Sequence, residues 1–384
     1  MQRSAFLLFA AFFSLTTACG SSDDGGAPAS GGTAGSGGAA GSGGAAGSSG
    51  AAGSGGMAGA AGAGGTPEWQ NVYSVDLTLP SASTPPFDVG STSVKYYENV
   101  PYGTDPRTVF DIMIPDGASP APLMIHIHGG GFVGGSKDDT WSGNSASIKN
   151  LMAQGVAYAS IEYRVLADGD DVGVIKPLTD SKRALQFIRY HAADFNIATD
   201  KIVLEGGSAG AGTSLWLAFH DDMAEPSSSD PVSQESTRVL GAAANSTQAT
   251  YDLKKWDSVV FKDFGISFLD AAVKQGLGPR LLAFYGIQSI DELDTPKIQA
   301  YRAEVDMLGL MTPDDPPFYV HNPLTPATIP LNENMLFHHA FHARALTEQA
   351  DGIGLSYIAT IEALNVADPS GKTDWDYALD LLAP

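Results

Sequence analysis

The chain has 384 residues, a formal net charge of −22 and one cysteine. Such an acidic chain lacks the basic surface that nucleic acids and anionic lipid surfaces attract, so we expect neither nucleic-acid binding nor electrostatic adsorption to membranes. A single cysteine excludes an intrachain disulfide, and the length fits one catalytic domain with an insertion.

The first 18 residues, 1–18, are predicted to be an export signal. A lone Arg3 precedes an apolar run over 5–13 that is too short to span a bilayer, and small residues then lead to Cys19. This pattern resembles a bacterial lipoprotein signal, which implies that Cys19 carries lipid and anchors the protein to a membrane of the cell envelope, on the periplasmic or surface side. Secretion after cleavage behind Ala18 is the alternative.

Residues 19–66 repeat Gly, Ala and Ser, with almost no charged or large apolar side chains. Such a segment cannot bury enough surface to offset its chain entropy, so we predict a flexible tether. Residues 67–384 have the composition of a folded domain and hold all 8 histidines.

Apolar runs and turn residues predict alternating strands and helices in this domain. An antiparallel pair is expected first, at 93–97 and 108–114. Later strands are expected at 123–127, 156–161, 202–204, 239–244, 316–321 and 356–361, with helices at 145–154, 176–193 and 336–349. Alternation of this kind is typical of an α/β protein with a doubly wound, mostly parallel sheet.

The strand at 123–127 leads into the segment 128–132, of sequence His-Gly-Gly-Gly-Phe. Hydrolysis of an ester develops an oxyanion, and successive glycines let backbone N–H groups approach it closely. We therefore predict an oxyanion hole formed by the N–H groups of Gly130, Gly131 and Ala209. His128 is expected to brace this loop instead of transferring protons.

A nucleophilic serine is predicted at Ser208, in the segment 206–210 of sequence Gly-Gly-Ser-Ala-Gly. A short apolar strand precedes the segment and an apolar helix follows it, and this order predicts a sharp strand-to-helix turn. The glycines allow the strained backbone of such a turn and let the strand and the helix close around the serine.

These two segments, together with Glu162-Tyr163-Arg164, occur in the order and at about the spacing of a known family. Over residues 94–382 the chain resembles carboxylesterases of the α/β-hydrolase fold, specifically those similar to hormone-sensitive lipase and the bacterial feruloyl and acetyl esterases. The resemblance implies an α/β-hydrolase fold and an acyl-enzyme on Ser208. Gly207 stands where that family often has aspartate.

The alternation of strand and helix breaks over about 249–312, where aromatic and aliphatic side chains fall in helical patches. A segment inserted after a strand of this sheet lies above the carboxyl ends of the strands, where open α/β folds bind ligands. We predict a helical cap that shapes the substrate pocket. Its aromatic side chains could equally form the cap's own small core.

The family's usual catalytic base is missing. Related esterases have an aspartate after the strand at 316–321 and a histidine after the last strand, whereas the loop 322–330 has no acidic residue and no histidine follows His342. A serine hydroxyl needs a base to remove its proton. His338 and His339 follow that loop, and we predict that one of them is the base.

Asp368 follows the final strand, where the family has its histidine. We predict that Asp368 orients the base, because triads are defined by geometry and not by chain order. Glu333 is the competing acid, and an aspartate before a proline is also a common turn residue.

Three other roles for histidines have less support in the sequence than a base at His338 or His339. His220 would lie about 18 Å from Ser208 along a helix, too far to act as its base. His342 would share a helix face with His338, which makes it the weaker candidate for the base. The spacing of His338 and His342 also suggests zinc, but the sequence offers no third ligand, so we expect neither a metal nor a cofactor.

The sequence therefore predicts a serine esterase that acts on a small or polysaccharide-linked carboxylic ester. A binding protein that keeps the cleft of the fold without efficient catalysis is the alternative, because the family's base is absent. A strained serine facing an oxyanion hole is not needed for binding alone, and this favours the esterase.

Overall fold

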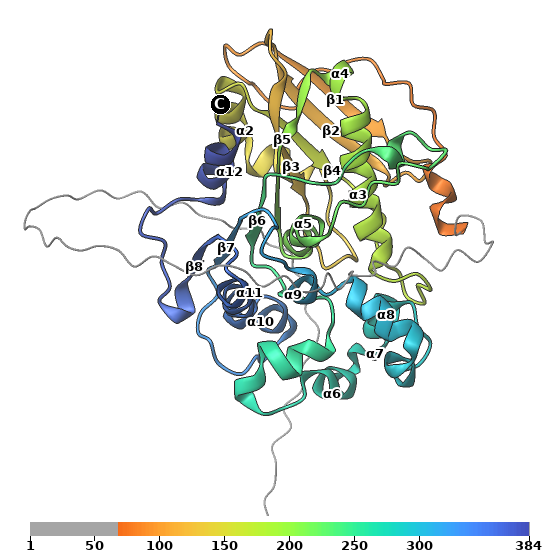
Figure 1. Cartoon of the computed structure of the whole chain (residues 1–384), viewed down its shortest axis with the longest axis vertical. Coiled ribbons are helices and arrows are strands. Elements are labelled where there is room, and N and C mark those ends of the chain that lie inside the picture. The colour runs from red at the N-terminus through yellow and green to blue at the C-terminus, as the bar shows by residue number, and fades with distance from the viewer. Residues whose placement is uncertain (1–67, 384) are drawn as a thin grey trace, which may run out of the picture. The chain divides into compact units, whose positions relative to one another are not determined.

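Within the described residues, an eight-stranded sheet organises the structure (Figure 1). The computed structural model describes residues 68–383, so the predicted signal, Cys19 and the segment 19–66 lie outside the described part. The strands lie side by side in the order β1-β2-β4-β3-β5-β6-β7-β8. Their bounds are β1 (Val94–Pro101), β2 (Val109–Pro115), β3 (Ala121–Ile127), β4 (Ala157–Ile161), β5 (Ile197–Gly207), β6 (Gly241–Asn245), β7 (Phe318–Asn322) and β8 (Tyr357–Ile361).

The pairing of the strands is mostly parallel. β2 pairs antiparallel with both β1 and β4, and every other neighbouring pair is parallel. β4 is buried along its whole length, as expected of a strand that is covered on both faces. The predicted antiparallel start and the doubly wound α/β sheet are therefore confirmed.

Successive side chains of each strand point to opposite faces of the sheet. Because apolar side chains therefore lie on both faces, helices cover both faces. On β3, Leu123 and Ile125 join the larger core, whereas Met124 between them joins a second core. The larger core includes side chains of α3 (Ile175–Tyr190), α5 (Ala209–Phe219) and α11 (Ala340–Ile353). The second core includes α1 (Asp139–Gly143), α2 (Ser145–Ala153) and α12 (Asp374–Leu382). In Figure 1 the sheet runs between α3 on one side and α2 with α12 on the other.

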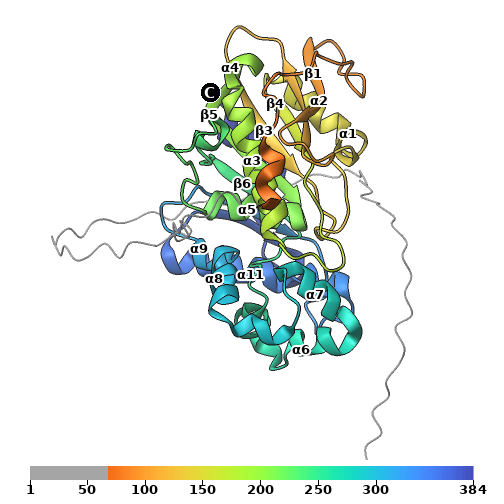
Figure 2. The same cartoon turned by 90° about the vertical axis from the view of Figure 1, so that its right-hand side faces the viewer.

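A group of short helices, which we call the cap, lies between β6 and β7. Its members are η3 (Trp256–Val260), η4 (Lys262–Phe264), α6 (Phe268–Ala272), η5 (Val273–Leu277), α7 (Gly278–Tyr285), η6 (Ile290–Asp294), α8 (Pro296–Glu304) and α9 (Met307–Leu310). All of them fall inside the range 249–312 predicted for the cap. Figures 1 and 2 both show α6, α7 and α8 beyond α5, far from β1.

The helix predicted at 336–349 is wrong in one respect that matters for the site. The structure has two helices there, α10 (Glu333–Phe337) and α11, with His338 and His339 between them. The backbone of His339 is extended, with φ −64° and ψ 141°, and its ring nitrogen accepts a hydrogen bond from the N–H of Phe341. His339 therefore caps α11 and turns the chain between the two helices.

Other elements differ less from the prediction. β5 begins at Ile197, five residues before the predicted strand at 202–204. α1, α12, α4 (Ala192–Phe195) and three 3₁₀ turns were not predicted, and the turns are η1 (Glu68–Tyr73), η2 (Val232–Gln234) and η7 (Glu362–Leu364). Over residues 68–383, none of the helices has the length and apolar character needed to cross a bilayer.

Candidate active site

Ser208 lies on a sharp turn between β5 and α5. Its backbone has φ 54° and ψ −119°, a left-handed conformation that is strained for a residue with a side chain. The N–H of Ser208 donates to the carbonyl of Asn245 at 2.8 Å, which ties the turn to the end of β6. A Cβ on Gly210 would lie 1.9 Å from the carbonyl oxygen of Ile127, so only glycine lets α5 start this close to β3.

His338 faces Ser208 across the carboxyl edge of the sheet. Ser208 Oγ and His338 Nε2 are 2.7 Å apart, although the two residues are 130 positions apart in sequence. The histidine backbone is held by Asn322, whose side-chain amide donates to the carbonyl of His338 at 2.9 Å. Gln248 holds the preceding carbonyl, that of Phe337, at 2.8 Å. The ring therefore stands on a backbone fixed from two other segments.

The second ring nitrogen of His338 faces an amide. His338 Nδ1 and Asn334 Oδ1 are 2.8 Å apart, with Asn334 on α10 and His338 one turn later at the end of that helix. An amide oxygen only accepts, so this contact assigns the ring proton to Nδ1 and leaves the lone pair of Nε2 to the serine hydroxyl. Burial lowers the pKa of His338 from its ordinary value of 6.5, which favours the neutral ring that a base requires.

His339, the other half of the predicted pair, lies away from Ser208. Its Nε2 donates to the carbonyl of Thr328 at 2.9 Å and its Nδ1 caps α11. The ring packs at 5.3 Å from that of Phe261 and the residue is 1% exposed. The structure thus uses His339 to join three segments, and of the predicted pair it brings only His338 to the serine.

The two predicted acids are placed elsewhere. The carboxylate of Asp368 accepts hydrogen bonds from the hydroxyl of Ser370 and from the N–H of Lys372, in the turn after β8. Glu333 pairs with Arg280 at 3.1 Å. The prediction that Asp368 orients the base is wrong in this geometry, because the Nδ1 side of His338 is occupied by Asn334, and Asp368 forms the turn that its proline neighbour favours.

The glycine loop 128–132 lies against the serine turn. A Cβ on Gly129 would stand 2.8 Å from the carbonyl of Gly207 and 3.3 Å from Ser208 Cβ. Gly130 and Gly131 have φ values of +107° and +60°, which turn the loop back on itself. Within residues 68–383 the N–H groups of Gly130 and Gly131 find no hydrogen-bond acceptor.

Ala209, the third predicted donor, is the first residue of α5. Its N–H belongs to the helix start, where backbone donors have no partner inside the helix. Gly131, Ser208 and Ala209 line the same cavity. The three predicted donors and the serine are thus drawn from two adjoining loops.

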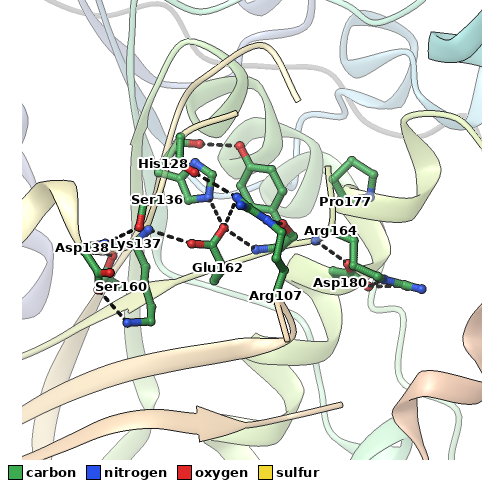
Figure 3. Close-up of polar contacts among 12 residues, drawn as sticks. Arg107, His128, Ser136, Lys137, Asp138, Ser160, Glu162, Arg164, Pro177 and Asp180 are labelled. Carbon is green, nitrogen blue, oxygen red and sulfur yellow. Dashed lines mark hydrogen bonds and ion pairs between the residues drawn. The ribbon is translucent and has the colours of Figure 1, made fainter. Parts of the chain in front are cut away.

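His128 braces the glycine loop, as the sequence predicted. Its Nε2 lies 2.9 Å from a carboxylate oxygen of Glu162, and its ring stacks at 4.1 Å on that of Tyr163. Figure 3 shows Glu162 at the centre of this cluster, with His128, Arg107 and Lys137 around it. Burial acts to raise the pKa of Glu162, but its bonds to His128, to the N–H of Lys137 and to Arg107 outweigh burial and hold it below the ordinary value.

The motif Glu162-Tyr163-Arg164 therefore supports the glycine loop 128–132. The hydroxyl of Tyr163 donates to the carbonyls of His128 and Gly129 at 2.8 and 3.1 Å. Arg164 pairs with the buried Asp180 of α3 at 2.6 Å, on the far side of the cluster in Figure 3. Glu162 and Tyr163 fix backbone in and beside the glycine loop, Arg164 joins this segment to α3, and none of these contacts reaches Ser208.

A mostly apolar cavity opens between Ser208 and the cap. Gly131, Phe132, Ser208 and Ala209 form its floor, and Arg280 and Gln248 are among its polar lining residues. Its apolar walls come from Tyr251, Leu253, Trp256, Phe268, Leu269, Ala272, Leu277, Leu281, Phe284, Leu336 and Phe337. Most of these residues belong to the cap, so several of its aromatic side chains face the site and do not serve only the cap's own core.

Comparison with known proteins gives relatives for the central part of the chain. Residues 110–263 match the family described as BD-FAE, a range that includes the glycine loop and Ser208 and ends before His338. The "Probable isoprenylcysteine alpha-carbonyl methylesterase ICMEL1" of Arabidopsis thaliana is 27% identical over 142 residues, 37% of this chain and 28% of that protein. Lipase 2 of Geotrichum candidum is 30% identical over 139 residues, 33% of this chain and 23% of the lipase. The chain thus spans well under half of either relative's length.

Solved structures match over more of the chain. A truncated carbohydrate esterase from gut microbiota has a TM-score of 0.54 at 17% identity, over 77% of this chain and 98% of that one. A bifunctional GH43-CE protein of Bacteroides eggerthii has a TM-score of 0.52 at 18% identity, over 75% of this chain and 38% of that one. At such identities the likeness shows a shared fold. By its sheet order, its serine turn and these matches, the protein has the α/β-hydrolase fold and is similar to the carboxylesterases of that fold.

Proposed function

We propose that the protein is a serine hydrolase that cleaves a carboxylic ester through an acyl-enzyme on Ser208, with His338 as the base. The observation that carries the proposal is the 2.7 Å contact between Ser208 Oγ and His338 Nε2 on a strained strand-to-helix turn. Strain at a single non-glycine residue is retained where the surrounding structure enforces it, and such residues gather at active sites.

The reaction follows from this geometry. His338 Nε2 takes the proton of the Ser208 hydroxyl as Oγ attacks the ester carbonyl carbon. The tetrahedral intermediate collapses, the alkoxide leaving group takes the proton from Nε2, and an alcohol departs. Water then attacks the acyl-serine with the same base, which releases the carboxylic acid and restores the hydroxyl.

The proposed oxyanion hole consists of the N–H groups of Gly130, Gly131 and Ala209. Their support is their position, since the N–H groups of Gly130 and Gly131 have no acceptor in the described part of the chain and Ala209 begins α5. Donors that are fixed before the reaction stabilise the developing negative charge without reorganising. Gly129 lets that loop approach the serine.

The cavity favours substrates with an apolar group on the acyl or the alcohol side. Its walls are aromatic and aliphatic, and the burial of such surface contributes roughly 25 cal/mol per Å². We propose a small-molecule ester, or an ester carried on a carbohydrate as the name of the carbohydrate esterase of similar fold suggests, whose apolar part enters the cap.

Mutation of the two reacting residues tests the proposal. Ser208→Ala should abolish turnover of a short-chain aryl ester, and His338→Ala should lower it by a factor on the order of 10³ or more. His321→Ala is the matched control, because His321 stands on β7, the strand that precedes the segment of His338, and its Nε2 bonds Glu362 at 2.8 Å. It should keep most of the wild-type rate. Full activity in His338→Ala would remove His338 from the mechanism.

One observation favours a binding protein as the second candidate, namely that no carboxylate among residues 68–383 is bonded to His338. A fluorophosphonate probe separates the two. The esterase should form a covalent adduct in the wild type and none in Ser208→Ala. A wild type that neither reacts with the probe nor hydrolyses esters would assign the cavity to binding alone.

A further inference from the structure

We propose that Asn334 is the positioning residue of the catalytic base, in the place that a carboxylate takes in a Ser-His-Asp triad. This inference rests on the proposed function of Ser208 and His338. Its evidence is the 2.8 Å contact between Asn334 Oδ1 and His338 Nδ1. The sequence predicted an acid at this point and did not single out Asn334.

The local structure of α10 fixes this contact. Asn334 and His338 are joined by a backbone hydrogen bond of 3.0 Å from the N–H of His338 to the carbonyl of Asn334, so their side chains lie on one helix face. Asn332 caps the same helix by accepting from the N–H of Met335 at 2.9 Å. A five-residue helix capped at its start therefore sets the distance between the amide and the ring.

The amide suits this role in one orientation. With Oδ1 toward the ring, Nδ1 keeps its proton and Nε2 remains free to accept from Ser208. The exposed position of Asn334 leaves its NH₂ group to water. The reverse orientation would favour the proton on Nε2 and remove the acceptor that the serine needs, which is how an asparagine in place of the triad aspartate slows a serine protease by about 10⁴-fold.

Within residues 68–383, no charged side chain is bonded to His338 to compensate the imidazolium that forms when it takes the proton. The elements around the ring carry the Arg280–Glu333 pair, on α7 and α10, and the buried His339 and His342. Burial lowers the pKa of both of these histidines, and of His338 itself. His128 of the glycine loop and Glu162, which follows β4, bond each other. The ring of His338 therefore lies beside two histidines whose burial favours the neutral form, and beside the Arg280–Glu333 pair, whose charges compensate each other.

Two consequences follow for the pH profile of kcat/KM. The acidic limb, where the base becomes protonated and activity is lost, should lie below 6.5 in the wild type. A carboxylate at the same distance would stabilise the protonated ring and shift that limb upward by roughly 1 to 3 pH units, with the lower figure expected for a residue in contact with solvent.

The test compares three variants of the full chain. Asn334→Asp should move the acidic limb up by about one pH unit and raise kcat above it, since the new carboxylate stabilises the imidazolium. Asn334→Ala should lower kcat by about tenfold or more with little change in KM, because the ring loses its orienting partner. Asn332→Asp is the matched control, because it makes the same change of charge at the N-cap of the same helix, where aspartate caps as well as asparagine, and it should leave the limb in place.

The outcomes separate this inference from the function on which it rests. If Ser208→Ala and His338→Ala are inactive while Asn334→Asp leaves the limb unmoved, or while Asn334→Ala keeps the wild-type kcat, Asn334 has no positioning role and the esterase proposal stands. If Ser208→Ala stays active, the function itself fails. Circular dichroism shows whether Asn334→Ala is folded, and the isosteric Asn334→Asp decides the question if it is not.

Discussion

At the scale of single residues, the site depends on glycines as much as on the groups that react. Ser208 holds its position because small residues let three main-chain segments meet, and Gly129 is the glycine at which the glycine loop contacts the serine turn. A Cβ there would meet the carbonyl oxygen of Gly207, which belongs to backbone and has no freedom to rotate away. The glycine loop or the serine turn would have to move.

We therefore predict that Gly129→Ala lowers kcat for a short-chain aryl ester by a factor on the order of 10² while the protein remains folded, because displaced donors stabilise the oxyanion poorly. Gly207→Ala is the control. A Cβ at Gly207 meets nothing within 4 Å and its φ is not positive, so its kcat should stay close to that of the wild type. Equal losses in both variants would mean that added bulk near the serine, and not the place of the loop, limits the rate.

At the scale of elements, the sequence predicted the sheet and missed the break that creates the site. The strands followed from apolar runs, which the covered faces of a parallel sheet require. The helix at 336–349 was predicted as continuous because the residues on both sides of His338 and His339 favour helix. Only tertiary contacts, such as the bond from Asn322 to the carbonyl of His338 and the cap formed by His339, end α10 and start α11.

The partner of the base is hard to predict from sequence for the same reason. Asp368 offers a carboxylate after the last strand, whereas an amide one turn before the base is not a recognisable signal for this role. The spacing of four between Asn334 and His338 was the available clue. It becomes meaningful only when a helix over both residues is known to face the serine.

His342 ties these elements together and makes them sensitive to acid. Its Nε2 donates to the carbonyl of Leu336 in α10 at 3.0 Å, and its Nδ1 accepts from the N–H of Ala249 at 3.2 Å. Burial lowers its pKa to about 3. In the unfolded chain the ring takes a proton near its ordinary 6.5, so the neutral ring stabilises the fold fully above that pH and progressively less below it.

We predict that the free energy of unfolding falls as the pH drops from about 6.5 toward 3, by up to about 1.4 kcal/mol per pH unit from His342 alone. Chemical denaturation at pH 7 and pH 5 measures this slope. His342→Gln should be less stable at pH 7 and should show a flatter slope, because glutamine does not titrate. His338 and His339 keep part of the slope, since burial lowers their pKa as well. An unchanged slope in His342→Gln would assign the acid sensitivity to other groups.

At the scale of the whole molecule, the fold accounts for the cavity, whereas the N-terminal sequence concerns where the protein is located. The cap and the cavity lie at the carboxyl edge of the sheet, where open α/β folds bind ligands. The chain's net charge of −22 gives it no electrostatic attraction to an anionic lipid surface. If the protein works at a membrane, the chain must be held there by another means, and Cys19 is the residue we propose for this.

We predict that the full chain, expressed in a bacterium that processes lipoproteins, partitions into the detergent phase, and that Cys19→Ser partitions into the aqueous phase or keeps its signal. Because Cys19 is the one cysteine of the chain, a maleimide gives a second measurement. A lipidated Cys19 has no free thiol and should not react, whereas a secreted protein cleaved behind Ala18 would carry a reactive thiol at its first residue. Recovery of the wild type in the aqueous phase with a maleimide adduct would replace the anchor by secretion. Esterase activity should be equal in the wild type and in Cys19→Ser on a soluble ester, since the anchor serves location and not chemistry.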